Sequence, residues 1–224
     1  MTSHALRRWQ LSCAALRITV VDMDVHSPQQ LEAEAALLND LRAGREAAFA
    51  ELVSRYSARL LTVARRLLNH EHDAQDALQD TFISAFRGLA TFDGKSSLAT
   101  WLHRIAVNAA LMKLRSKRHK PEQPIEELLP KYYEDGHRQN PGPAWAMPAD
   151  CLENAETREL VRRCIAQLPD SYRIILVLRD TEQMETAAVA NHLGIEAGAV
   201  KTRLHRARQA LRTLLDPYFR GAAS

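Results

Sequence analysis

An all-α protein, with two small helical domains joined by a proline-rich linker, is predicted by three observations. Apolar residues recur along most of the chain at spacings of three and four, which is the period of an amphipathic helix. The 224 residues include only 8 Gly, few for a protein built from strands and tight turns. Six of the 9 Pro lie between Pro121 and Pro148. A chain of this length has room for two modest domains, each with its own core.

Four helices are predicted before the linker, forming a bundle-like domain at residues 31–118. A short helix is expected at about 31–43. The longest apolar stripe indicates a second helix, and its members are Phe49, Leu52, Val53, Tyr56, Leu60, Val63 and Leu67. Further stripes indicate helices over 74–89 and 98–112, and Ser96 or Ser97 is the expected N-cap of the last one. Residues 1–30 are expected to form a disordered tail.

Residues 119–152 are predicted to be the linker, residues 153–216 a second helical domain, and residues 217–224 a short tail. In the second domain, Ala190, Gly194 and Val200 have the spacing of a helix-turn-helix. A small residue lets the two helices cross closely, Gly adopts the positive φ of the turn, and Val anchors the second helix to the core. A plain helical hairpin can have the same three residues at the same spacing. The composition of the helix after the turn therefore has to distinguish a helix-turn-helix from a plain hairpin.

That helix contains the basic stretch GAVKTRLHRARQALR at residues 198–212, with five Lys or Arg and no acid. At 100° per residue, its apolar residues share one arc: Val200, Leu204, Ala207 and Leu211. The opposite arc carries donors that can reach base edges in the major groove: Lys201, Thr202, His205 and Arg206. The flanking cations are expected to contact phosphates or to remain surface charges: Arg203, Arg208 and Arg212. The alternative interpretation is the solvated face of an ordinary packed helix.

The first domain has an acidic and a basic surface. Residues 67–86 contain four acids and no Lys or Arg, whereas residues 113–120 contain five Lys or Arg in eight positions. Asp73, Asp76 and Asp80 lie within about 60° of one another on a helix. They predict a docking face for a basic partner, with Gln79 at its edge, although a plain acidic surface is the alternative. Asn108 has an amide that can bond a base edge through two hydrogen bonds.

No enzymatic, metal or cofactor site is predicted. The cysteines are isolated, with no paired spacing: Cys13, Cys151 and Cys164. His70 and His72 point apart on a helix, and no third ligand stands at a useful spacing. Charged residues interrupt the apolar run near the N-terminus, and no stretch approaches the roughly 20 apolar residues of a membrane span. A cytoplasmic protein without a small-molecule substrate is therefore expected.

Two sets of motifs lie on either side of the linker. The first block contains DAQDALQDTFISAFRGLATF and SSLATWLHRIAVNAALMKLR, and the second contains QLPDSYRIILVLRD and VANHLGIEAGAVKTRLHRARQALR. In this order the blocks resemble regions 2 and 4 of a bacterial RNA polymerase sigma factor of the extracytoplasmic-function (ECF) group. The resemblance covers residues 31–118 and 153–216.

The resemblance implies a subunit that binds core RNA polymerase, at the clamp helices of the largest catalytic subunit and at the flap region, and that directs it to promoter DNA. The docking residues implied are Asp76, Gln79 and Asp80. The minus 10 element is read as a melted strand by Phe92, Lys95, Ser96 and Asn108, with Lys113 and Arg115 on phosphates. The minus 35 element is read as duplex by Lys201, Thr202, His205 and Arg206, with Arg203 and Arg208 on phosphates.

An anti-sigma factor, often membrane-bound in this family, is a further partner that the resemblance implies. One alternative stays open at this stage. A free-standing helix-turn-helix regulator, whose N-terminal domain senses a signal or dimerises, has the same basic helix and the same turn.

Overall fold

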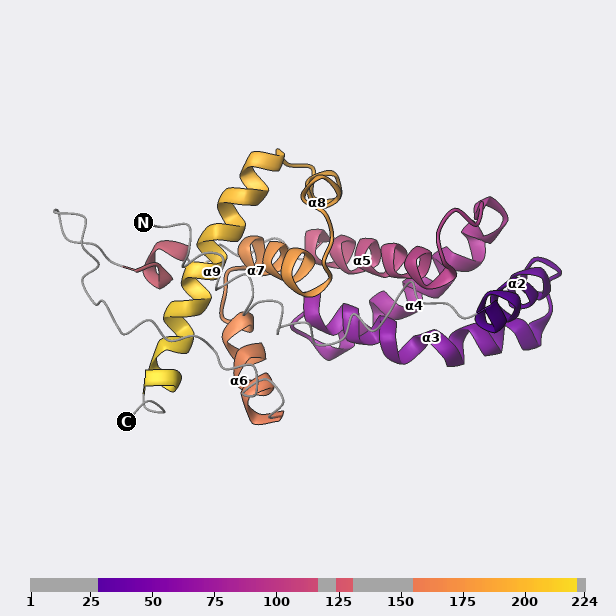
Figure 1. Ribbon diagram of the computed structural model, residues 1–224, viewed down its shortest axis with the longest axis horizontal. Helices are drawn as coiled ribbons and strands as arrows, with labels where there is room; N and C mark the ends of the chain where they lie inside the picture. Colours follow the sequence, from indigo (N-terminus) through magenta and orange to yellow (C-terminus); the bar gives the residue numbers. More distant parts are fainter. Residues whose placement is uncertain (1–27, 117–123, 131–154, 221–224) are drawn as a thin grey trace. The chain divides into compact units, whose positions relative to one another are not determined.

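The computed structural model describes residues 28–116, 124–130 and 155–220. They divide into two compact units: residues 28–116 form the N-terminal unit, and residues 124–130 with 155–220 form the C-terminal unit. Every regular element within these ranges is a helix and none is a strand (Figure 1), which confirms the all-α prediction. None of the helices described is both long enough and apolar enough to span a bilayer.

The N-terminal unit consists of α2 (Pro28–Arg42), α3 (Glu46–Leu67), α4 (Glu71–Gly88), the 3-10 turn η2 (Leu89–Thr91) and α5 (Leu98–Ser116). Helices α3, α4 and α5 pack against one another, and α2 packs against α3. Their apolar stripes meet in one core, which includes Leu41, Leu52, Leu60, Phe82, Leu98 and Leu102. The four predicted helices are therefore present, although α2 begins inside the segment that was predicted to be a tail.

Helix α5 begins with two side-chain caps. Ser97 Oγ accepts the Thr100 N–H at 3.2 Å, as an N-cap serine does, which confirms one of the two expected caps. Glu34 on α2 accepts the Leu98 N–H at 2.5 Å, and this carboxylate is buried. Since the first amides of a helix have no partner within the helix, the two caps fix where α5 starts.

The C-terminal unit contains a short 3-10 helix, η3 (Ile125–Leu128), and then α6 (Ala155–Ala166), α7 (Asp170–Leu176), one turn of π-helix, η5 (Val177–Thr181), α8 (Thr186–Leu193) and α9 (Ala197–Arg220). Helix α9 packs against α6, α7, α8 and η3. The core of the unit includes Val161, Ile175, Leu178, Val189, Val200 and Leu211.

Two predicted boundaries differ from the structure. Helix α9 runs through Pro217 to Arg220, beyond the predicted start of the tail. Leu215 and Asp216 are buried there, and Cys164 Sγ on α6 is 3.9 Å from the Leu214 carbonyl, so packing holds this turn of the helix. Residues 124–130 of the predicted linker form η3 and pack against α9. The rest of the predicted linker lies outside the described residues.

Candidate nucleic-acid interface

The turn between α8 and α9 has the geometry that its sequence predicts. Gly194 ends α8 in the left-handed region, with φ of 65°. Ala190 is 8% exposed and Val200 is fully buried, so both contribute to the contact between the two helices. Glycine adopts a positive φ without the steric cost that a Cβ imposes. The helix-turn-helix is therefore present at the predicted position.

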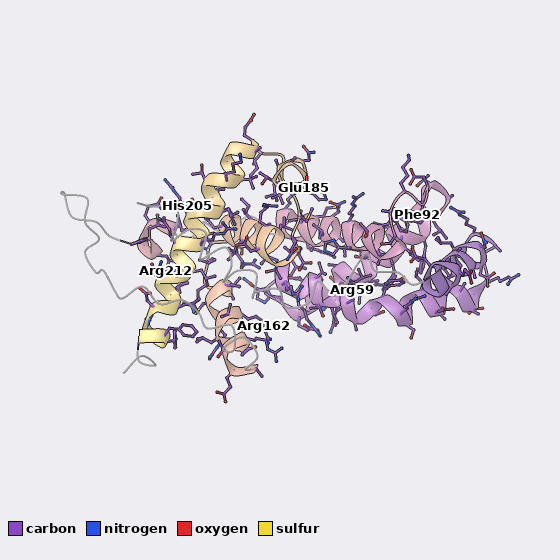
Figure 2. All side chains as sticks on the ribbon, viewed as in Figure 1. Arg59, Phe92, Arg162, Glu185, His205 and Arg212 are labelled. Atoms are coloured by element: carbon purple, nitrogen blue, oxygen red, sulfur yellow. The ribbon has the colours of Figure 1, made fainter. Side chains whose placement is uncertain are left out.

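The surface of α9 is divided as its angular pattern predicts. The apolar arc is buried: Val200, Leu204, Ala207 and Leu211. The candidate base-reading residues are all exposed: Lys201, Thr202, His205 and Arg206. Figure 2 labels His205 on this helix. The Thr202 hydroxyl donates to the Gly198 carbonyl at 3.1 Å, so it has a partner within its own helix.

Arg208, a predicted phosphate contact, is instead part of the internal structure of this unit. Its guanidinium donates twice to Asp180 of η5, from Nε at 2.8 Å and from Nη2 at 2.5 Å. The two side chains are only 21% and 7% exposed. This bidentate pair with a buried carboxylate occupies the fork of the guanidinium, so the phosphate contact of Arg208 stays a prediction that requires the pair to open. Arg203 and Arg212 are partly exposed, as Arg208 is.

Arg206 has a partner that the sequence did not predict. Its Nη1 lies 3.4 Å from Glu126 Oε1, and Glu126 belongs to η3 in the segment predicted as linker. Both side chains keep substantial exposure, 45% for Arg206 and 65% for Glu126. This contact therefore lies at the edge of the exposed face of α9.

The loop between η2 and α5 contains the predicted minus 10 residues. Phe92 is buried, with its ring centroid 4.9 Å from that of Trp101. Arg42 of α2 donates to the Phe92 carbonyl at 2.9 Å. Phe92 therefore anchors the loop to the core in this structure, and its role in reading the minus 10 element stays a prediction that requires the ring to become accessible. Figure 2 labels it beside the loop.

The other candidate residues of this region lie at or near the surface. Lys95 is exposed and its Nζ is 2.7 Å from Asp93 Oδ2. Hydrogen bonding by Lys95 lowers the pKa of Asp93 below its ordinary value. Ser96 is partly exposed, and Asn108 is exposed on α5. The loop and the amide of Asn108 are thus available to a ligand without rearrangement of the core.

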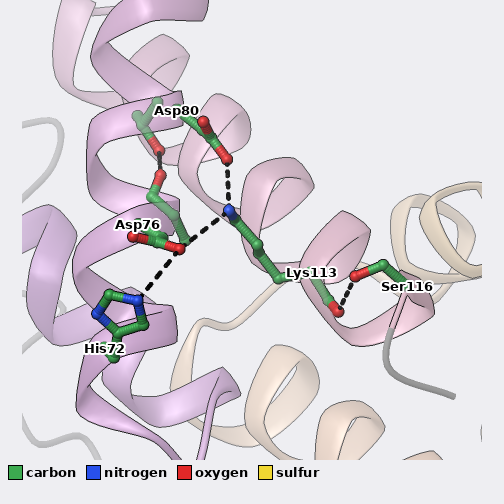
Figure 3. Close-up of polar contacts among 7 residues, drawn as sticks. His72, Asp76, Asp80, Lys113 and Ser116 are labelled. Atoms are coloured by element: carbon green, nitrogen blue, oxygen red, sulfur yellow. Dashed lines mark hydrogen bonds and ion pairs between the residues drawn. The ribbon is translucent and has the colours of Figure 1, made fainter.

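The acidic face of α4 is linked to α5 through one lysine (Figure 3). Lys113 Nζ lies 3.1 Å from Asp80 Oδ2 and 3.4 Å from Asp76 Oδ2, and His72 Nε2 is 4.0 Å from Asp76 Oδ2. Hydrogen bonding to Asp80, opposed by some desolvation, raises the pKa of Lys113. Lys113 was predicted to contact DNA phosphate, and in this structure it is paired with Asp76 and Asp80, the carboxylates predicted to dock on polymerase.

Gln79 is exposed beside these carboxylates, as the prediction of a docking face requires. Asp73 is 6% exposed, so it is not part of the face to which the sequence assigned it. Arg115, the other predicted phosphate contact on α5, is exposed. No group of three or more His, Cys, Asp or Glu that could hold a metal ion occurs within the ranges described.

Comparison with known families matches both units. The Sigma-70 region 2 family matches residues 52–120, and the Sigma-70 region 4 family matches residues 158–211. The ECF RNA polymerase sigma factor SigW of Bacillus subtilis is 31% identical over 187 residues, which cover 80% of this chain and 94% of SigW. The chain belongs to the ECF sigma factors.

A second sequence relative agrees with this assignment. The ECF RNA polymerase sigma factor SigM of Mycobacterium tuberculosis is 35% identical over 182 residues, covering 81% of this chain and 84% of SigM. Among solved structures, CnrH in complex with the cytosolic domain of CnrY is 28% identical, with a TM-score of 0.48, and covers 83% of this chain and 98% of CnrH. A region 2 match is not expected of a free-standing helix-turn-helix regulator, so that alternative is not favoured for this sigma factor.

Three positioning residues of the sigma factor were missed by sequence reasoning. Glu34 caps α5, Arg42 holds the Phe92 carbonyl, and Asp180 holds Arg208. Each is an isolated charged residue whose partner is between 28 and 64 positions away in the chain. A sequence signal existed only for Glu34, which stands three, four and seven positions before Leu37, Leu38 and Leu41, on the side of α2 that carries these core leucines.

Proposed function

We propose that this ECF sigma factor docks on core RNA polymerase through α4 and contacts promoter DNA through one surface on each unit. The observation that carries the proposal is the presence of sigma regions 2 and 4 on two separate helical units, each with exposed candidate contact residues. The chain acts by binding, without catalysis of its own, in the cytoplasm where polymerase and chromosome are found.

The minus 35 element is assigned to the exposed arc of α9. Lys201 and Arg206 supply charge and hydrogen-bond donors, and His205 is exposed on the same helix. The buried arc fixes the helix to the domain, so these side chains are presented on a rigid element. Arg203 and Arg212, at the edge of the arc, are assigned to phosphates.

The minus 10 element is assigned to the loop that Phe92 anchors and to the adjacent surface of α5. A base that leaves the duplex needs hydrogen bonds to its edge, and Asn108 offers both a donor and an acceptor. Lys95 and Arg115 supply positive charge for the single strand. Lys113 joins this surface only when it leaves Asp76 and Asp80.

Docking on the clamp helices of the polymerase is assigned to Asp76, Gln79 and Asp80 on α4, and the flap region of the polymerase is assigned to the C-terminal unit. An anti-sigma factor that covers either surface would keep the sigma factor inactive, and we include such a partner in the proposal because the family implies it.

Run-off transcription with purified core polymerase tests the proposal, using promoters mapped on genomic DNA. Asp80→Arg reverses a charge on the docking face, and Glu51→Arg makes the same change at an exposed position of α3. We expect Asp80→Arg to weaken holoenzyme assembly at least tenfold and Glu51→Arg to leave it within twofold. Equal assembly by the two variants contradicts the docking assignment.

The minus 35 assignment has its own pair of variants. His205→Ala combined with Lys201→Ala should reduce transcription from promoters that depend on the minus 35 element, whereas Arg162→Ala, at an exposed position of α6, should not. Tight binding of the full chain to a palindromic duplex without polymerase would instead support the free-standing regulator.

A further inference from the structure

Residues 124–130, in the first third of the predicted linker, are docked on α9, the proposed DNA-reading helix. They belong to the same compact unit as α9, and η3 packs directly against α9. Ile125 is 2% exposed, which is the burial of a core residue. A flexible spacer between two domains does not usually bury an isoleucine. Burial of Ile125 stabilises the state in which the segment is bound to α9, relative to the many conformations in which it is detached.

The same segment has an electrostatic contact with the proposed base reader. Glu126 Oε1 lies 3.4 Å from Arg206 Nη1. An arginine contacts guanine through the two N–H groups of its fork, and a carboxylate beside that fork competes for the same donors. Glu126 and Glu127 are adjacent and both exposed, so they also place negative charge at the edge of the surface where DNA phosphates are expected.

We infer that residues 124–130, here called the strap, restrain the minus 35 reader in the free sigma factor and must leave α9 before Arg206 reads a base. Ile125 is the anchor of the strap and Glu126 is the group that competes with DNA. The inference rests on the proposed function, because it assumes that the exposed arc of α9 reads the minus 35 duplex. Strap and DNA then bind α9 in competition, so each weakens the binding of the other by the same factor.

Binding of the full chain to a duplex tests the strap, with the minus 35 element taken from a promoter mapped by run-off transcription. Glu126→Gln and Glu127→Gln each remove one negative charge, so their effect on the general electrostatic attraction for DNA is matched. Of these two glutamates, only Glu126 forms an ion pair with α9 among the contacts of the described residues. We expect Glu126→Gln to tighten binding by about two- to fivefold relative to Glu127→Gln.

Ile125→Ser removes the anchor and should tighten binding by about tenfold, since it detaches the strap from the whole of its site. Its thermal unfolding is measured beside the binding curve, and Glu126→Gln tests the inference independently if Ile125→Ser does not fold. Equal affinities for Glu126→Gln and Glu127→Gln would overturn the role of Glu126.

Hydrogen exchange of the unaltered chain provides a readout without any substitution. The Glu127 N–H donates to the Pro124 carbonyl at 3.4 Å and the Leu129 N–H donates to the Glu126 carbonyl at 3.3 Å, so both amides are protected while η3 is formed. Their exchange should accelerate when the minus 35 duplex is added. Unchanged exchange at saturating duplex shows that the strap stays in place and overturns the inference.

Different results would overturn the role of α9 and the role of the strap. If His205→Ala with Lys201→Ala binds the duplex as well as the unaltered chain does, the assignment of α9 as the reader is wrong. If that variant loses affinity but the Glu126 pair and the exchange of the strap show no effect, only the inference about the strap is wrong.

Discussion

Lys113 of α5 lies with its Nζ 3.1 Å from Asp80 Oδ2 of α4, and this ion pair joins two surfaces to which the sequence assigns different partners. Asp80 is a proposed polymerase contact, and Lys113 was predicted to meet DNA. Asp76 and Asp80 are one turn apart and repel each other, so a cation between them relieves that repulsion. A basic group on the polymerase has to compete with Lys113 for the same two carboxylates.

The first prediction follows from this competition. Lys113→Met leaves the docking carboxylates without their internal cation, and binding to core polymerase should become about two- to fivefold tighter, as the loss of exposed ion pairs allows. Titration of labelled sigma factor with core polymerase measures it. Arg115→Met removes a cation two positions along the same helix and should leave the affinity for polymerase unchanged. Weaker binding by Lys113→Met would show that Lys113 itself contacts the polymerase.

A second prediction concerns the pair between Asp180 and Arg208. Asp180→Asn leaves the Arg208 guanidinium without its charge partner at a site where little water reaches. Loss of a buried partner costs about 3–5 kcal/mol, and the partial exposure of Arg208 reduces this to about 2–4 kcal/mol. Urea denaturation measures the free energy of unfolding. Glu159→Gln, in the exposed pair with Arg162, should cost less than about 0.5 kcal/mol, and similar losses for both variants would contradict the assigned role of Asp180.

A third prediction concerns the cap that α2 supplies to α5. Glu34→Ala leaves the Leu98 N–H without its acceptor in a buried position, which costs about 1–3 kcal/mol of folding free energy. Glu32→Ala, at an exposed position on the same helix, is the matched control and should be nearly neutral. Because the capped end of α5 follows the minus 10 loop, Glu34→Ala should also weaken binding of the melted minus 10 strand to the holoenzyme. Normal strand binding by a destabilised variant would limit Glu34 to a structural role.

The fourth prediction compares two glycines with opposite conformations. A Cβ at Gly194 or at Gly198 meets no atom within 4 Å, so neither site is limited by space. Gly194 has φ of 65°, and Gly194→Ala should destabilise the chain by about 1–2 kcal/mol through backbone strain. Gly198 lies in α9, where Gly198→Ala should stabilise by about 0.5–1 kcal/mol. Thermal unfolding of both variants gives the signs, and a change of the same sign in both would refute the argument from φ.

The sequence predicted the features that depend on the spacing of residues within one helix. The apolar stripes of α3 and α9 are set by residues three and four apart, and the arc from Val200 to Leu211 could be assigned to the core before any partner was known. The turn at Gly194 was predictable for the same reason, because the steric requirement is local to that residue.

Contacts between elements were not predictable in this way. Lys113 and Arg208 both lie on basic stretches, and a basic stretch does not indicate which of its cations face a carboxylate on another helix. Phe92 illustrates the same limit, since its burial depends on the position of Trp101 and on the hydrogen bond from Arg42. The docking of Ile125 was missed because Ile125, Leu128 and Leu129 span only about one helical turn between two prolines, which is too short for a period to be recognised.

The division of α9 into a buried and an exposed arc has a consequence for how sigma factors diverge. Exposed positions such as Lys201 and His205 tolerate substitution with changes in stability of about 0.5 kcal/mol or less, because they contribute little to the core. Under the proposed minus 35 assignment, promoter preference therefore changes by mutation while the fold is retained. A duplicated gene for this protein could acquire a new set of target promoters through a few substitutions on one side of a single helix.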